Sequence, residues 1–278
     1  MKKISENKCF GGSVQVWEHA SRALNCDMKF SIFLPSQAAE RKVPLITFLS
    51  GLTCTHENFT TKSGAYQRAA ELGLAILAPD TSPRGDEVPD DADSYDFGKG
   101  AGFYINATSM PWTKHYKMEN YIVDELYTLI PENFPVDGAN QSIMGHSMGG
   151  HGALTLYLKH HEQYQSTSAF SPIVAPASVP WGKKAFERYL GSDTTKWVEH
   201  DASELVKKNP QETPILIDQG LDDQFLEEQL KPDIFESACK DAGQPLTLRK
   251  HAGYDHSYYF IQTFINDHLD HHVEYLTE

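Results

Sequence analysis

The sequence predicts an α/β protein with a mostly parallel central sheet of about eight strands and helices on both faces. Short apolar runs, typical of strands that are covered on both faces, alternate with segments long enough for a crossover helix. The composition, with 40% hydrophobic and 22% charged residues in 278, is that of a globular protein. No repeat, low-complexity tract or linker interrupts the alternation, so we expect a single domain over residues 1–278.

The predicted elements follow from these runs in chain order. Two strands, 13–20 and 28–34, are close enough in the chain to pair antiparallel. The later apolar runs predict strands at 43–50, 75–79, 141–145, 166–170, 214–218 and 245–250. Crossover helices are expected at 63–72, 118–130, 150–160 and 232–241, and a last helix at about 257–268.

Two segments, 81–113 and 172–197, are expected as loop excursions over the active site. The first is rich in Gly, Pro and Asp and has no clear period, and loops of that length within a domain are usually functional or disordered. Its aromatic residues favour an ordered loop: Tyr95, Phe97, Phe103 and Tyr104. Both segments follow predicted strands, which is where α/β folds bind ligands.

Charge and cysteine usage exclude several classes of function. With 24 Lys+Arg against 38 Asp+Glu, the formal charge is −14, which argues against nucleic acid or an anionic membrane as the partner. No apolar run approaches the roughly 18 residues of a membrane span. The lysine-led N-terminus has no apolar segment behind it and does not read as a secretory signal. The sequence has four cysteines, Cys9, Cys26, Cys54 and Cys239, and they form no CxxC pair, so we expect no zinc site. A chain of this length without an export signal is not expected to form a disulfide framework. We therefore expect reduced thiols and a cytoplasmic location.

The motif that carries chemistry is Gly145-His146-Ser147-Met148-Gly149, which fits G-x-S-x-G. It follows a strand-like run and precedes a glycine-rich helix pattern, the context that a nucleophile elbow requires. Small neighbours let the strand and the helix approach closely, so the serine hydroxyl is held at the end of the sheet. The sequence therefore predicts an α/β-hydrolase fold with Ser147 as nucleophile.

A serine hydroxyl needs a base to take its proton and an acid to orient that base, in the chain order Ser, acid, His for this fold. The turn after the strand 214–218 contains Asp222 and Asp223. Asp223 is the preferred acid because it lies further into the loop and precedes the aromatic Phe225. Asp222 remains an alternative, and Asp218 is expected to belong to the strand.

For the base we favour His256, since a loop between the last strand and the last helix lets its imidazole lie over the serine. His251 lies directly at the end of that strand. His146 is expected to pack beneath the elbow, because neighbours at a sharp turn point in different directions. The remaining histidines after Asp223 are expected to be solvated in a polar tail: His268, His271 and His272.

An oxyanion site needs two fixed N–H donors. One is expected from Met148, the residue after the nucleophile. The other is expected from the loop after the strand 43–50, where Gly51 permits an unusual turn and presents the N–H of Leu52.

The sequence resembles the S-formylglutathione hydrolase family of α/β hydrolases, also called the esterase D family. The matching segments run across nearly the whole chain: Phe48–Thr55, Asp80–Gly85, Gly100–Thr108, Gly145–Ala153, Phe170–Pro172, Ile217–Gly220 with Asp223 and Phe225, and Tyr254–Phe260. The resemblance implies hydrolysis of S-formylglutathione to formate and glutathione in formaldehyde detoxification, with side activity on short-chain esters. It also implies the triad Ser147, His256 and Asp223, the donors Leu52 and Met148, no metal or cofactor, and a homodimer.

The resemblance further suggests a thiol near the site, Cys54, whose modification blocks activity, although an inert buried cysteine is the alternative. Glutathione is anionic, so binding to a protein of charge −14 needs local positive groups. Lys62, Arg84 and Lys99 lie in loops that suit this role, yet each is more typical of a solvated surface charge. Rival interpretations are a general short-chain carboxylesterase, an acyltransferase on the same fold, and a non-catalytic binding scaffold.

Overall fold

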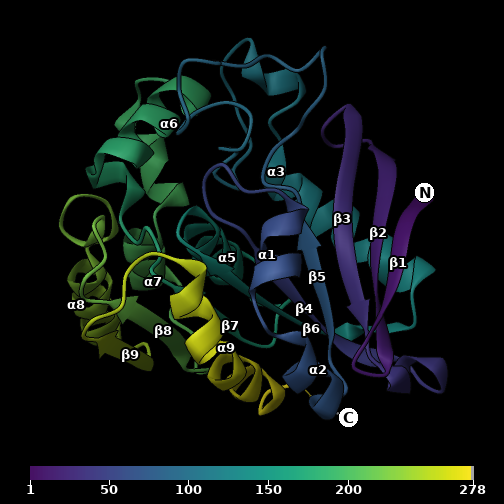
Figure 1. Ribbon diagram of the computed structural model, residues 1–278. Helices are drawn as coiled ribbons and strands as arrows, with labels where there is room; N and C mark the ends of the chain where they lie inside the picture. Colours follow the sequence, from purple (N-terminus) through teal and green to yellow (C-terminus); the bar gives the residue numbers. More distant parts are fainter. Residues whose placement is uncertain (277–278) are drawn as a thin grey trace.

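A nine-stranded sheet organises residues 1–276, the part of the chain that this computed structural model describes (Figure 1). The strand order across the sheet is β1-β2-β3-β5-β4-β6-β7-β8-β9. Antiparallel pairing joins β1 to β2, β2 to β3 and β3 to β5, and the strands from β5 across to β9 are parallel. The strands are β1 (Lys2–Cys9), β2 (Gly12–Ser21), β3 (Cys26–Leu34), β4 (Val43–Leu49), β5 (Ala75–Pro79), β6 (Val136–His146), β7 (Thr167–Phe170), β8 (Ile215–Gly220) and β9 (Leu246–His251). The predicted α/β-hydrolase architecture is confirmed.

Helices cover both faces of this sheet (Figure 1). One face carries α1 (His56–Lys62), α2 (Tyr66–Leu72) and α9 (Tyr258–Val273). The other carries α3 (Met118–Asn120), α4 (Tyr127–Asn133), α5 (Met148–Lys159), α6 (Pro180–Leu190), α7 (Ala202–Lys208) and α8 (Pro232–Ala242). No helix within residues 1–276 is both long enough and apolar enough to cross a bilayer.

The period-two pattern of the central strands explains why there are two cores. In β4, Val43 and Leu45 join the hydrophobic cluster under α5, while Ile46 and Phe48 join the cluster under α2 and α9. Successive side chains of a strand point to opposite faces, so a strand that is apolar at both sets of positions must be covered on both sides. Because the strands from β5 across to β9 are parallel, their carboxyl ends lie at one edge of the sheet.

The eight predicted strands are all present, but a ninth, β1, was not predicted. Its sequence, KKISENKC, is almost entirely polar and mostly exposed, because it is an edge strand with no helix over it. β1 and β2 form a hairpin whose turn contains Phe10 and Gly11, both of which have positive φ (45° and 78°). The two glycines at 11 and 12 were the available signal for this hairpin.

The predicted helix at 63–72 is α2, shortened to Tyr66–Leu72, and a separate helix α1 precedes it. Thr55 is the N-cap of α1 and forms a capping box with Asn58. Gly64, with φ of 70°, lies between the two helices and separates them. The short helix α7 was also not predicted. The excursion at 172–197 contains α6, so it is partly helical.

The expectation that His268, His271 and His272 are solvated was wrong. The last helix continues to Val273, and His268 and His272 are fully buried on its inner face, while His271 is half-buried. Serines of the neighbouring strand segment bond these rings: Ser168 Oγ lies 2.8 Å from His268 Nδ1, and 2.8 Å from His272 Nε2. The spacing Ile261, Ile265, His268, His272 follows one helical face, which the polar character of histidine concealed.

Candidate active site

Ser147 lies at the turn between β6 and α5 with φ of 58° and ψ of −118°, a conformation that L-residues rarely adopt. Two glycines make this turn possible. A Cβ on Gly145 would lie 2.1 Å from the carbonyl oxygen of Gly149, and one on Gly149 would lie 1.9 Å from that of Leu49. The strand, the helix and β4 therefore approach more closely than any side chain at these positions allows. This is the strained strand-to-helix turn that the motif predicts.

Asp223 and His256 come together from two different loops. Asp223, in the turn after β8, is buried, and its Oδ2 lies 2.5 Å from His256 Nδ1. The backbone N–H of Phe225 donates to the other oxygen of Asp223, Oδ1, at 2.9 Å. These contacts hold one imidazole nitrogen on the carboxylate and leave Nε2 for other partners.

The other two carboxylates of this region have different partners. Asp222 is exposed, and its Oδ1 accepts the N–H of Gly253 at 3.3 Å. Asp218 is buried in β8, and its carboxylate pairs with Arg249 and with the rings of His251 and His268. The structure therefore brings Asp223, and neither alternative, to His256.

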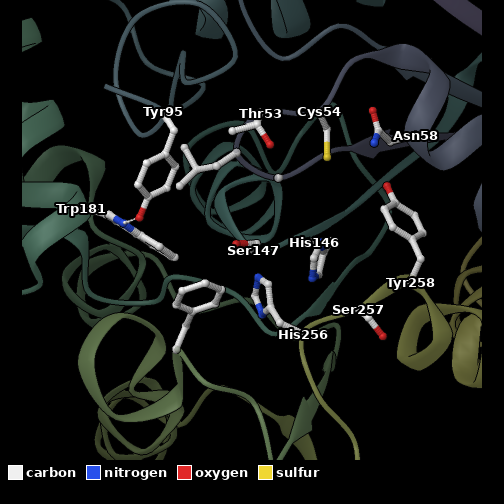
Figure 2. A pocket seen from close by; sticks show the side chains of 13 residues that line it. Thr53, Cys54, Asn58, Tyr95, His146, Ser147, Trp181, His256, Ser257 and Tyr258 are labelled. Atoms are coloured by element: carbon white, nitrogen blue, oxygen red, sulfur yellow. Dashed lines mark hydrogen bonds between the residues drawn. The ribbon is translucent and has the colours of Figure 1, made fainter. Parts of the chain in front are cut away.

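The imidazole of His256 is held on its faces as well as at Nδ1. Its centroid lies 4.5 Å from the ring of His146 and 5.0 Å from the ring of Phe225. Ser147 and His256 line the same pocket, and Figure 2 shows the imidazole directed toward the serine, with His146 beside it. The three side chains that the elbow and the later loops supply thus meet at one edge of the sheet.

His146 is buried at the end of β6, as expected, yet it also lines the pocket. Neither of its ring nitrogens has a hydrogen-bond partner among residues 1–276. Burial holds the pKa of His146 well below its ordinary value, and the nearby His256 acts in the same direction. His146 therefore presents a neutral ring to His256 and adds no charge that competes with proton transfer.

The loop after β4 packs directly on the serine. A Cβ on Gly51 would lie 3.1 Å from the Cβ of Ser147. The N–H of Leu52 has no acceptor among the residues that the structure describes, and the N–H of Met148 lies in the first turn of α5, where such groups lack intrahelical partners. Tyr104 supports this loop, because its hydroxyl donates to the carbonyl of Ser50 at 2.8 Å.

Cys54, two residues further on, lines the same pocket and is half-buried. Burial raises the pKa of its thiol, and the ammonium of Lys62 opposes that rise. A thiol with a raised pKa is a poor nucleophile at neutral pH. Its position nevertheless means that a reagent attached to it would occupy the pocket.

Cys54→Ser is expected to lower kcat/KM for p-nitrophenyl acetate by about threefold at most, because the thiol takes no part in proton transfer. The same variant should lose most of the sensitivity of the esterase activity to iodoacetamide. Cys26→Ser, which removes a half-buried thiol outside the pocket, should leave that sensitivity unchanged. A folded but inactive Cys54→Ser enzyme would contradict this assignment.

Opposite Cys54, the pocket has an aromatic wall that the sequence motifs did not predict. Trp181 from α6 lies 4.7 Å, centroid to centroid, from Phe225, and its Nε1 donates to the hydroxyl of Tyr95 at 3.0 Å. The two excursions, at 81–113 and 172–197, each contribute one residue to this wall (Figure 2). The only available signal for Trp181 was its location in a segment that follows a predicted strand. The pocket volume is about 290 Å³, which suits a small acyl group.

The three basic residues considered for an anionic substrate have different surroundings. Arg84 is engaged by the protein itself, since its Nε lies 2.9 Å from Asp80 Oδ2 and its Nη2 donates to the carbonyl of Cys54 at 3.1 Å. Lys99 does not line the pocket. Lys62 is exposed, and its Nζ lies 5.7 Å from the ring centroid of the pocket residue Tyr258. Within residues 1–276 no group of three His, Cys, Asp or Glu side chains is arranged to hold a metal ion.

The chain is similar to known hydrolases over nearly its whole length. A family model described as putative esterase matches residues 21–271. Over 99% of both chains, the sequence is 56% identical to S-formylglutathione hydrolase of Rattus norvegicus, and it is 54% identical to that of Mus musculus over the same share. A solved S-formylglutathione hydrolase of Agrobacterium tumefaciens is 49% identical and covers 100% of both chains with a TM-score of 0.98.

Proposed function

This chain belongs to the esterase family, and from that membership we propose that it hydrolyses the thioester S-formylglutathione to formate and glutathione, with side activity on short-chain carboxylic esters. The observation that carries the reaction class is the hydrogen bond from His256 to the buried carboxylate of Asp223, beside a serine in a strained turn. A serine, an imidazole and a carboxylate in this order act as nucleophile, base and orienting group in acyl transfer. The substrate is supported by the names of the full-length relatives.

In the proposed mechanism, Ser147 Oγ attacks the formyl carbonyl carbon while His256 Nε2 takes the hydroxyl proton. Asp223 holds the other imidazole nitrogen and stabilises the charge that the ring gains. The carbonyl oxygen becomes an oxyanion, which accepts hydrogen bonds from the N–H groups of Leu52 and Met148. The carbon–sulfur bond then breaks, His256 returns the proton to sulfur, and glutathione leaves a formyl ester on Ser147.

Water completes the reaction by the same steps. His256 takes a proton from water as the oxygen attacks the formyl ester, the oxyanion is held by the same two donors, and the ester bond to Ser147 breaks. The proton returns to the serine oxygen, and formate is released. A thioester carbonyl is already reactive, so the protein mainly supplies positioning and charge stabilisation.

The test compares kcat/KM for S-formylglutathione with kcat/KM for p-nitrophenyl acetate in the same buffer. The proposal expects a clear preference for the thioester. Parity, or a preference for the simple ester, would instead assign a general short-chain carboxylesterase. Including an added alcohol in the assay separates hydrolysis from acyl transfer, since an acyltransferase would form the new ester in place of formate.

We further propose a cytoplasmic homodimer that needs no cofactor. The four cysteines are unpaired thiols, which agrees with a reducing compartment. The dimer rests on the family resemblance, and sedimentation velocity of the purified protein tests it.

A further inference from the structure

A second hollow adjoins the catalytic pocket on the side of Cys54 and Tyr258. It lies between the end of α1 and the start of α9, has a volume of about 490 Å³, and is lined by Thr61, Lys62, Tyr258, Tyr259 and Gln262. Tyr258 belongs to both cavities, so its ring forms their common wall. Figure 2 shows Tyr258 and Asn58 at this end of the catalytic pocket, opposite Tyr95 and Trp181. A leaving group that extends from Ser147 past this ring would enter the hollow.

The hollow contains a positive charge that no acidic side chain within residues 1–276 neutralises. Lys62 makes no ion pair or hydrogen bond with the described residues, and its Nζ lies over the ring of Tyr258. Three other cations of the segments that line the pocket are paired: Arg84 with Asp80, Lys184 with Asp96, and Arg188 with Asp91. In a protein of formal charge −14, this hollow beside the catalytic pocket therefore offers an unpaired ammonium to an anion.

We propose that the Lys62 hollow binds a carboxylate of the leaving thiol, so that the enzyme selects acyl thioesters of anionic peptide thiols. This inference rests on the proposed function and names the group that recognises the thiol part of the substrate. Glutathione carries two carboxylates, and each belongs to a residue next to the cysteine. Two residues of extended chain span roughly 7 Å, which is the scale of the tyrosine ring that separates the two cavities.

Electrostatics explain why one lysine matters here. The negative charge of the protein repels an anionic substrate at long range, and screening confines that repulsion to about 8–10 Å at physiological salt. The Lys62 ammonium lines the hollow in which the carboxylate would bind, so it acts within this distance. Thr61 and Gln262 add hydrogen-bonding groups to the same hollow, and the exposed ring of Tyr259 (81% accessible) flanks it.

The experiment compares Lys62→Gln and Lys62→Glu with the wild-type enzyme on two formyl thioesters, one of glutathione and one of N-acetylcysteamine, which has no carboxylate. We expect KM for S-formylglutathione to rise about threefold in Lys62→Gln and roughly tenfold in Lys62→Glu, with kcat unchanged, as for an exposed ion pair. KM for the neutral thioester and turnover of p-nitrophenyl acetate should stay at wild-type values. The increase should shrink at high ionic strength.

Lys240→Glu is the matched control, because Lys240 is an exposed lysine of α8 that lines neither cavity. It makes the same change in net charge. Equal effects of Lys62→Glu and Lys240→Glu on S-formylglutathione, or equal effects of Lys62→Glu on the two thioesters, would overturn the inference. If the wild-type enzyme prefers S-formylglutathione and Lys62→Glu leaves KM unchanged, only the inference fails. If the wild-type enzyme does not prefer S-formylglutathione over the neutral thioester, both the inference and the proposed substrate fail.

Discussion

Ser147→Ala is expected to reduce kcat on the order of 10⁶-fold for both the thioester and p-nitrophenyl acetate, because the proposed mechanism forms the acyl-enzyme on the hydroxyl of Ser147. Ser147 is 3% exposed and sits at the turn between β6 and α5, beside His256 in the pocket. The variant keeps the Cβ and the backbone strain of the turn, so its melting temperature should stay close to that of the wild type. Burst-phase kinetics measure acyl-enzyme formation and the turnover that follows it, and thermal melts followed by circular dichroism measure the melting temperature.

A serine lining the same pocket provides the control. Ser257 is already engaged, since its hydroxyl donates to Asp255 Oδ1 at 2.6 Å, and Ser257→Ala should retain activity. A fluorophosphonate should label the wild type and Ser257→Ala but leave Ser147→Ala unlabelled. In addition, Ser147→Ala combined with His256→Ala should be no slower than Ser147→Ala alone, because residues that act as one unit are not additive. Residual burst kinetics in Ser147→Ala would point to a different nucleophile.

Asp223→Asn is expected to lower kcat by about 10⁴-fold. The carboxylate Oδ2 accepts a hydrogen bond from His256 Nδ1, which fixes the ring tautomer with Nε2 free to accept the serine proton. An amide group at this place can donate to Nδ1 instead, which favours the tautomer with a proton on Nε2. Binding should change less than turnover, because Asp223 is buried behind the imidazole and does not line the pocket.

The neighbouring aspartate gives this prediction its control. Asp222 is exposed and bonds only the backbone of the loop, so Asp222→Asn should stay within about twofold of the wild-type kcat. Steady-state kinetics of both variants decide between the two carboxylates that the sequence left open. A large loss in Asp222→Asn with little loss in Asp223→Asn would reverse the assignment.

Local signals in the sequence were sufficient for the elbow and for most of the sheet. The glycines at 145 and 149 are required by close backbone contacts, and the alternating apolar positions of β4 require cover on both faces. The contact of Gly149 is with Leu49, a hundred residues earlier, yet each constraint fixes the residue type at its own position, so a pattern of residue types within one segment indicates it. The edge strand β1 escaped prediction because an exposed strand needs no apolar pattern.

The histidines of the last helix show where local patterns fail. Histidine is a polar residue type, so a hydropathy pattern does not predict its burial. The hydrogen-bond partners of His268 and His272 are Ser166 and Ser168, which lie a hundred residues earlier, and no residue near the histidines in the chain indicates this pairing. The aromatic wall of the pocket has the same origin. Trp181 and Tyr95 meet only because two irregular segments fold over the same edge of the sheet.

By itself, the sequence determined the fold class, the serine at its turn and a short set of acid and base candidates, because each depends on residue types and on their order and spacing along the chain. Tertiary structure decided that Asp223, rather than Asp222, reaches His256, and that Lys62 stands unpaired beside the pocket while Arg84 is engaged by Asp80. Those choices depend on where distant loops end above the sheet, and the packing of its two buried cores sets those positions.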